Sequence, residues 1–223
     1  MTIKGVVFDF GGVILSFENI KPFWDAYDKQ AGLPIGTIAA EVKGTGFTEW
    51  TGKGGIFTGE ISVEEVENGL FSQYINEKYN TNLPLKMTVL SSCLANPDHV
   101  VFSKKIHLLI KQLHGKGLKS ALLTNNCYLD IEHKEARLPY DTSVFDVVVE
   151  SCIEGVMKPD QKIYKIMSDR LGLEPNELVF LDDLKENCEA AVALGWQAIQ
   201  VDLSKEDEAV EKLESLLNVK FDF

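Results

Sequence analysis

The stretch GVVFDFGGV at residues 5–13 decides the fold of this chain. It begins with apolar residues, as in a buried strand, and leads to one carboxylate, Asp9, and then to Gly11 and Gly12. An acid that ends a strand lies at the carboxyl edge of a sheet, where open α/β sheets bind their ligands. Glycines at that edge let the backbone approach a ligand closely. Many buried strands end in Asp, so the interpretation depends on the later segments of the chain.

Strand-like and helix-like segments alternate from residue 99 onward. Apolar residues recur at helical spacing in 106–113, 163–171 and 210–217, and another helix is expected before Gly195. Strands are predicted between these helices, at residues 120–124, 145–150, 178–181 and 197–201, and the N-terminal strand at 3–8 must join them. This alternation predicts the α/β class, with a Rossmann-like three-layer core in which helices cover both faces of a parallel sheet.

Residues 17–97 have a different pattern, dominated by helical periodicity. We therefore expect a core formed by residues 1–16 and 98–223, with residues 17–97 as an inserted α-helical cap. Ser62 and Glu65 predict a capping box at the start of one cap helix. The glycine-rich stretch 43–59, which contains three aromatic residues, is either a flexible loop between cap helices or a specificity loop over an active site.

Composition narrows the classes of partner. The formal net charge is −12 and the Lys and Arg residues are not clustered, which argues against a nucleic-acid or acidic-membrane surface. No apolar run approaches the roughly 18 residues of a membrane span, and the N-terminus lacks a secretory pattern. The cysteines are widely spaced, as in proteins with free thiols, at positions 93, 127, 152 and 188. We expect a cytoplasmic protein with no nucleic-acid or membrane partner.

Candidate functional side chains follow the predicted strands. They are Asp9 after the first strand, Thr124 and Asn125 after the second, Lys158 at a helix start beyond the third, and Asp182 and Asp183 after the fourth. Because parallel strands end at the same edge of a sheet, we expect these residues to converge although they are far apart in sequence.

The chemistry of these residues is complementary. Asp182 and Asp183 beside Asp9 provide the carboxylate oxygens that Mg²⁺ prefers. Thr124 and the N–H groups after it can hold an anionic oxygen, and Lys158 can offset the carboxylates. Each feature alone has an ordinary interpretation, such as an acid pair on a loop, a Thr-Asn turn or a solvated lysine. Their order and their shared edge together indicate a phosphoryl-transfer site.

Four segments resemble, in order, the four motifs of the haloacid dehalogenase-type hydrolase superfamily. They are DFGGV at 9–13, LLTN at 122–125, GVMKP at 155–159 and VFLDD at 179–183. The chain is also similar to the N-terminal phosphatase-like domain of soluble epoxide hydrolase and to the related domain of an acyl-CoA dehydrogenase family member, most specifically at 145–195. This resemblance implies a C1-type cap, Mg²⁺ as cofactor and a phosphorylated small molecule as substrate. It leaves open whether the protein is a monomer or a homodimer.

The resemblance also implies a role for each motif residue. Asp9 would attack phosphorus and form an aspartyl-phosphate that water hydrolyses. Thr124 and Asn125 would hold phosphoryl or substrate oxygens, and Lys158 would balance the charge of nucleophile and phosphate. The metal ligands would be Asp9, the main-chain carbonyl of Gly11, and Asp183, with Asp182 close by, either as a further ligand or next to one.

The chain departs from the superfamily pattern at Gly11, where phosphatases usually carry a second Asp. That residue transfers protons to the leaving group and from the attacking water. General acid–base catalysis contributes about 10²–10⁴ in rate, so we expect slow hydrolysis of a small phosphomonoester. The alternative is a catalytically impaired relative that binds a phosphorylated ligand or partner.

A third interpretation is carbon–halogen hydrolysis. Dehalogenases of the superfamily also lack the second acid and need no metal. They typically carry an aromatic residue and a threonine after the nucleophile, where this chain has Gly11, Gly12 and Val13. The sequence therefore favours phosphate ester hydrolysis.

Overall fold

The structure is a computed structural model that describes residues 2–43, 55–92, 99–134, 136 and 138–223. The chain divides into two compact units. The first, here called the sheet unit, comprises Met1–Ser16, Phe102–Asn125 and Tyr140–Phe223. The second, here called the helical unit, comprises Phe17–Val101 and Asn126–Pro139. The expected core and cap boundaries stay a prediction, and segment 126–139, which groups with the helical unit, was not part of that expectation.

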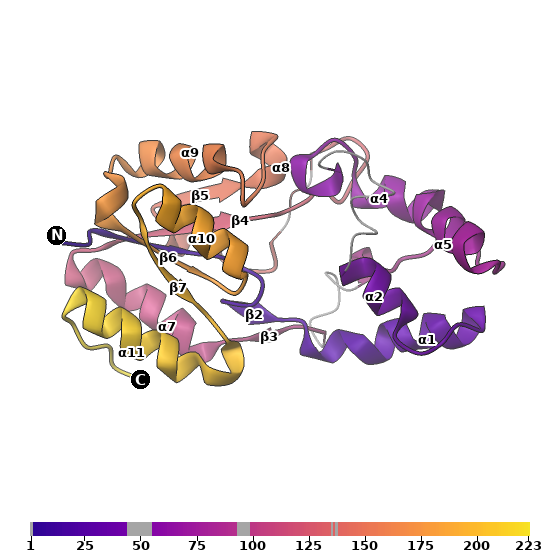
Figure 1. The fold of residues 1–223 in the computed structure, drawn as a ribbon, viewed down its shortest axis with the longest axis horizontal. Helices are drawn as coiled ribbons and strands as arrows, with labels where there is room; N and C mark the ends of the chain where they lie inside the picture. The colour runs from indigo at the N-terminus through magenta and orange to yellow at the C-terminus, as the bar shows by residue number, and fades with distance from the viewer. Residues whose placement is uncertain (1, 44–54, 93–98, 135, 137) are drawn as a thin grey trace. The chain divides into compact units, whose positions relative to one another are not determined.

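The sheet unit is built on a five-stranded sheet with strand order β5-β4-β1-β6-β7 (Figure 1). Every neighbouring pair is parallel. The strands are β1 (Gly5–Phe8), β4 (Lys119–Thr124), β5 (Val147–Glu150), β6 (Leu178–Asp182) and β7 (Gln197–Gln200). The predicted α/β class with a parallel sheet is therefore confirmed.

Helices cover this sheet on both faces. Figure 1 shows α9 (Gln161–Leu171) and α10 (Lys185–Ala193) on one face and α7 (Lys104–Leu113) and α11 (Glu206–Leu217) on the other. The predicted apolar stripe of α7 is buried, and the Ser103 hydroxyl accepts the Ile106 N–H at 3.0 Å to cap this helix. The remaining short elements of this part of the chain are β2 (Leu15–Ser16), β3 (Val101–Phe102), α8 (Ser151–Glu154), and 3-10 turns at His114–Lys116, Thr142–Val144, Pro175–Glu177 and Leu203–Lys205.

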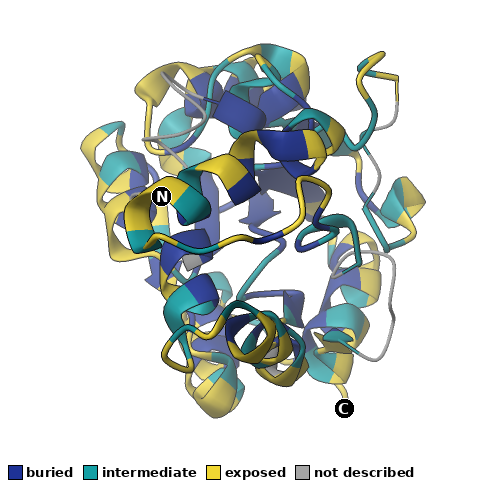
Figure 2. Cartoon of the chain, turned by 90° about the vertical axis from the view of Figure 1, so that its right-hand side faces the viewer, coloured by how far each residue is buried: buried dark blue, intermediate teal, exposed yellow. Residues whose placement is uncertain are grey.

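The helical unit has its own apolar core. Its elements are α1 (Lys21–Ala31), α2 (Thr37–Lys43), α4 (Val63–Glu65), α5 (Phe71–Tyr79), 3-10 turns at Glu18–Ile20 and Gly55–Thr58, and a π turn at Val66–Leu70. The side chains of Trp24, Ile38, Phe71, Ile75 and Met87 are buried together in this core. Burial follows the inner helix faces, while the outer faces are exposed (Figure 2).

The capping box at the start of α4 is confirmed. The Ser62 hydroxyl accepts the Glu65 N–H at 3.2 Å, and the Glu65 carboxylate accepts the Ser62 N–H at 2.7 Å. In the predicted glycine-rich loop, residues 44–54 lie outside the described residues, so both interpretations of that loop stay open. No helix in the described part of the chain combines the length and apolar character needed to cross a bilayer.

Candidate active site

Asp9 lies directly after the central strand of the sheet. The register pairs Phe8 with Leu122 on one side and with Leu181 on the other, so three strands end together at this point. The Asp9 N–H donates to the Leu181 carbonyl at 2.8 Å, and the residue is 8% exposed. The predicted convergence of strand ends therefore brings Asp9 next to the carboxyl end of β6.

Lys158 provides a buried positive charge between two carboxylates. Its Nζ lies 2.6 Å from Asp9 Oδ1 and 2.7 Å from Asp182 Oδ2, and its side chain is 1% exposed. Burial opposes the charge of this ammonium, but the two carboxylates more than offset that effect, so the pKa of Lys158 is raised. The lysine is therefore charged and fixed rather than solvated.

The Asp182 carboxylate is engaged on both oxygens. Oδ1 accepts the Leu184 N–H at 2.8 Å, and the Asn187 amide donates to Oδ1 at 3.0 Å and to Oδ2 at 3.1 Å. With Lys158 on Oδ2, this carboxylate has several hydrogen-bond partners and no exposed surface. Its contacts suit a group that orients Lys158.

Asn187 is a site residue that the sequence reasoning missed. It is 2% exposed in the first turn of α10, and its main-chain carbonyl accepts the Tyr164 hydroxyl at 2.9 Å. The sequence predicts a helix before Gly195 that would contain Asn187, but it does not show which positions of that helix face the sheet. Its partner could not be chosen from sequence alone.

Asn125 and Thr124 lie at the end of β4. The Asn125 side chain accepts the Lys158 N–H at 2.9 Å and donates to the Lys158 carbonyl at 3.1 Å, so it fixes the backbone that carries the lysine. Thr124 is the last residue of its strand and is 4% exposed. The structure places Asn125 next to the Lys158 backbone and Thr124 at the carboxyl end of β4, and their contacts with substrate oxygens stay a prediction.

Asp183 packs against Gly12. The backbone of Gly12 has φ +76°, and a Cβ atom there would lie 2.4 Å from both Cγ and Oδ2 of Asp183. Gln200 donates its amide to the Asp183 carbonyl at 3.0 Å. Only glycine at position 12 therefore leaves room for this half-buried carboxylate.

Carboxylate oxygens of Asp9, Asp182 and Asp183 lie within 4.8 Å of one another. Burial raises the pKa of Asp9 to about 7, with Lys158 lowering it and Asp182 raising it. Burial and the charge of Asp182 also raise the pKa of Asp183. Three acids with one lysine leave excess negative charge, so the oxygen-rich cluster fits a divalent cation such as Mg²⁺.

Gly11 contributes no side chain, and its main chain lies two residues after Asp9. It forms a bridge with Leu15, and its φ lies outside the left-handed region, unlike that of Gly12. The predicted metal-binding role of its carbonyl stays a prediction.

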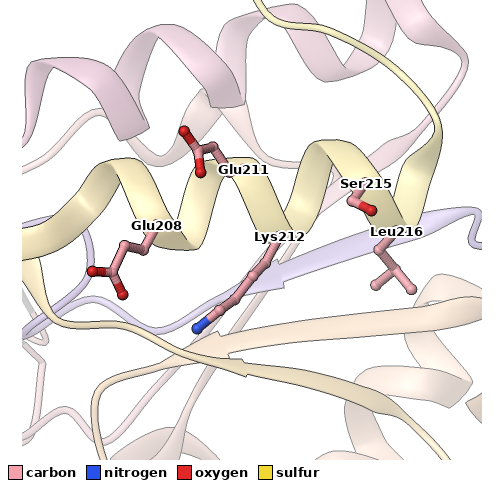
Figure 3. A pocket seen from close by; sticks show the side chains of 5 residues that line it. All are labelled: Glu208, Glu211, Lys212, Ser215 and Leu216. Atoms are coloured by element: carbon pink, nitrogen blue, oxygen red, sulfur yellow. The ribbon is translucent and has the colours of Figure 1, made fainter.

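A hollow along α11 shares no residue with this cluster. It is lined by Glu208, Glu211, Lys212, Ser215 and Leu216, whose side chains project from one helix (Figure 3). These groups do not combine a buried acid with a buried lysine, as the Asp9 cluster does. The candidate active site is therefore the cluster at the carboxyl edge of the sheet.

The model of the haloacid dehalogenase-like hydrolase family matches residues 3–195. The chain belongs to this family. The membership expected from the four motifs is therefore confirmed, and the protein is a haloacid dehalogenase-like hydrolase. Its relatives include phosphatases of Aspergillus oryzae and Mycobacterium tuberculosis, matched over 90% and 97% of this chain.

Two longer proteins contain a similar segment. This hydrolase is 36% identical over 218 residues to acyl-CoA dehydrogenase family member 10 of Mus musculus, and 30% identical over 237 residues to bifunctional epoxide hydrolase 2 of Sus scrofa. The matches cover 96% and 99% of this chain, but only 19% and 40% of those proteins. The hydrolase thus corresponds to one part of each relative.

A solved structure shares the fold. The haloacid dehalogenase family enzyme BT-2542 of Bacteroides thetaiotaomicron was solved in complex with magnesium and inorganic phosphate. It matches with a TM-score of 0.56 and 21% identity, over 89% of this chain and 93% of that chain.

Proposed function

We propose that this hydrolase is a Mg²⁺-dependent phosphatase that cleaves a small phosphomonoester through an aspartyl-phosphate at Asp9. The observation that carries the proposal is the Lys158 ammonium held between Asp9 and Asp182, with the Asp183 carboxylate within 4.8 Å of both acids. Phosphatases among the relatives, and the magnesium and phosphate bound to BT-2542, support the same reaction class.

Asp9 is the nucleophile in this proposal. Its Oδ1 is held by Lys158, so we assign the attack on phosphorus to Oδ2. The P–O bond to the leaving group breaks as the Asp9 O–P bond forms, and the leaving oxygen departs as an anion that takes a proton from solvent water. Water then attacks the phosphorus of the aspartyl-phosphate, releases phosphate and restores the carboxylate. Lys158 stays charged throughout and faces the negative charge of the phosphoryl oxygens.

The ligands of Mg²⁺ would be Asp9, Asp183 and the main-chain carbonyl of Gly11. When bound, Mg²⁺ supplies positive charge that reduces repulsion between the nucleophile and the phosphoryl group. Asp182 would orient Lys158, because its oxygens already accept hydrogen bonds from Lys158, Leu184 and Asn187. Thr124 would hold a phosphoryl oxygen, and Asn125 would position Lys158.

Residues 17–97 are proposed to act as the cap that selects the substrate. The support is the separate apolar core of the helical unit and the position of these residues between β1 and the rest of the sheet in the sequence. Substrate choice would then depend on side chains of this unit rather than on the Asp9 cluster.

The absence of an acid at position 11 favours a second candidate function. With no carboxyl side chain at Gly11 to move protons, the protein would bind a phosphorylated ligand or partner with little turnover. Phosphate binding without turnover across a broad substrate panel would favour this candidate over the phosphatase.

The test is phosphate release from p-nitrophenyl phosphate, whose leaving group needs little protonation. We expect turnover with Mg²⁺, its loss in excess chelator, and its loss in Asp9→Asn. Asp169→Asn is the matched control, because it neutralises an exposed carboxylate on α9. Equal rates in wild type and Asp9→Asn would reject the proposal.

A further inference from the structure

We infer that Phe180 is a positioning residue for this reaction, and that the face of its ring holds the Lys158 ammonium in place. The inference rests on the proposed phosphatase function and concerns a side chain that has no role in the motif chemistry.

The ammonium has a third neighbour besides the two carboxylates. Lys158 Nζ lies over the Phe180 ring, 5.2 Å from its centroid. Both side chains are buried, with Phe180 at 0% exposure. A cation within about 6 Å of a ring face is attracted by the negative charge above the ring, and the attraction is larger where water is excluded.

The same strand supplies both the acid and the ring. Phe180 and Asp182 are two positions apart on β6, so their side chains point to the same face of the sheet. Lys158 reaches this face from the loop before α9 and meets both side chains at once. The geometry of one strand therefore sets the distance between the carboxylate and the aromatic partner of the lysine.

The ring cannot tilt freely, because two aromatic side chains meet it edge to face. Its centroid lies 5.8 Å from that of Tyr164 and 6.2 Å from that of Trp196, at interplanar angles of 86° and 87°. Tyr164 is itself fixed by its hydroxyl bond to the Asn187 carbonyl. This packing keeps the ring face toward the ammonium.

An aromatic ring suits the position beside the Lys158 ammonium better than a third hydrogen-bond acceptor would. An ammonium has three N–H groups, and two of them are directed at Asp9 and Asp182. The ring attracts the charge without accepting a conventional hydrogen bond, so within the described part of the chain one N–H group remains for a phosphoryl oxygen. Phe180 thus holds the lysine while leaving it able to act on the substrate.

The test replaces Phe180 with phenylalanines that carry one, two or three ring fluorines. Fluorine withdraws charge from the ring face with little change in shape. We expect kcat/KM for Mg²⁺-dependent phosphate release to fall stepwise, by roughly tenfold for the trifluoro ring. The Mg²⁺ concentration for half activity should stay unchanged, since the ring is proposed to act on Lys158 and not on a metal ligand.

The matched control is the same series at Phe145, a buried phenylalanine that packs against Phe8 and Tyr140. Melting temperatures should change equally little at both positions. A flat kcat/KM at position 180, or an equal loss at position 145, would overturn the inference.

Failure of the proposed function has a different signature. If the wild type releases no phosphate, the phosphatase proposal fails by itself. Inorganic phosphate binding by calorimetry then tests the ring directly. Weaker binding by the trifluoro protein than by wild type supports the role of Phe180, and equal binding rejects it.

Discussion

Gly11 and Gly12 are neighbours with different backbone conformations. Gly12 adopts φ +76° and has the Asp183 carboxylate where a Cβ would stand, whereas Gly11 has an ordinary φ. Glycine at position 12 is therefore required by the geometry of the acid cluster. Glycine at position 11 marks the place of a missing acid, which a substitution can restore.

Gly12→Ala should weaken Mg²⁺ binding because the new methyl group must displace Asp183. We expect the Mg²⁺ concentration for half activity to rise by at least about tenfold. This corresponds to a loss of roughly 1.4 kcal/mol in the free energy of Mg²⁺ binding. Mg²⁺ titrations of activity measure it. Gly115→Ala is the control, because nothing lies within 4 Å of a Cβ at that exposed position. Equal titration curves for Gly12→Ala and wild type would contradict the assigned position of Asp183.

Gly11→Asp should accelerate turnover of substrates with poor leaving groups. The new carboxyl group can donate a proton to the leaving oxygen, and such catalysis is worth up to about 10²–10⁴ in rate. Steady-state rates on an alkyl phosphate, compared with p-nitrophenyl phosphate, measure the effect, which should be larger for the alkyl ester. No gain on either substrate would show that proton transfer does not limit the rate.

Helix N-termini in this chain can carry capping residues that are recognisable in the sequence. Ser62→Ala removes the hydroxyl that caps α4, and the loss of such a cap costs about 1 kcal/mol. Urea unfolding followed by circular dichroism should show a free energy of unfolding lower by this amount. Ser215→Ala, on the exposed side of α11, should leave it almost unchanged. Equal unfolding curves for the Ser62 variant and wild type would contradict the contribution of this cap.

Strand ends were predictable at the scale of elements, but contacts across elements were not. Periodicity and turn residues are local properties, so the five strands and the ends that carry Asp9, Thr124 and Asp182 could be located from sequence. The π turn at Val66–Leu70, with Gly69 at φ 155°, has no comparable local signal. Asn187 was missed for the same reason, because its role depends on a carboxylate supplied by another element.

The protonation state of Asp9 affects the stability of the whole molecule. Asp9 has its pKa raised from 3.8 to about 7 by burial, so the folded state holds this proton more tightly than the unfolded chain. A carboxyl group whose pKa is raised on folding stabilises the folded state most at low pH. This contribution is lost as the pH rises from 3.8 to about 7. The metal-free protein therefore loses stability as the pH rises toward neutrality.

Asp9→Asn should remove this loss of stability toward neutral pH. In excess chelator, the melting temperature of the variant minus that of wild type should increase between about pH 4 and about pH 8, since only wild type loses the proton. Differential scanning calorimetry across this range measures the difference, and Asp169→Asn serves as the exposed control. A difference that stays constant with pH would contradict the raised pKa of Asp9.

The most direct measurement is a rapid acid quench during turnover, followed by mass spectrometry of the peptide that contains residue 9. With p-nitrophenyl phosphate, whose leaving group needs little protonation, the lack of a side chain at Gly11 to activate water should slow only the second step. The covalent intermediate should then accumulate, and the wild type should carry phosphate on Asp9 only when Mg²⁺ is present. Asp9→Asn should carry none. Continued turnover with an unmodified Asp9, or phosphate on a different residue, would contradict the assignment of Asp9 as nucleophile.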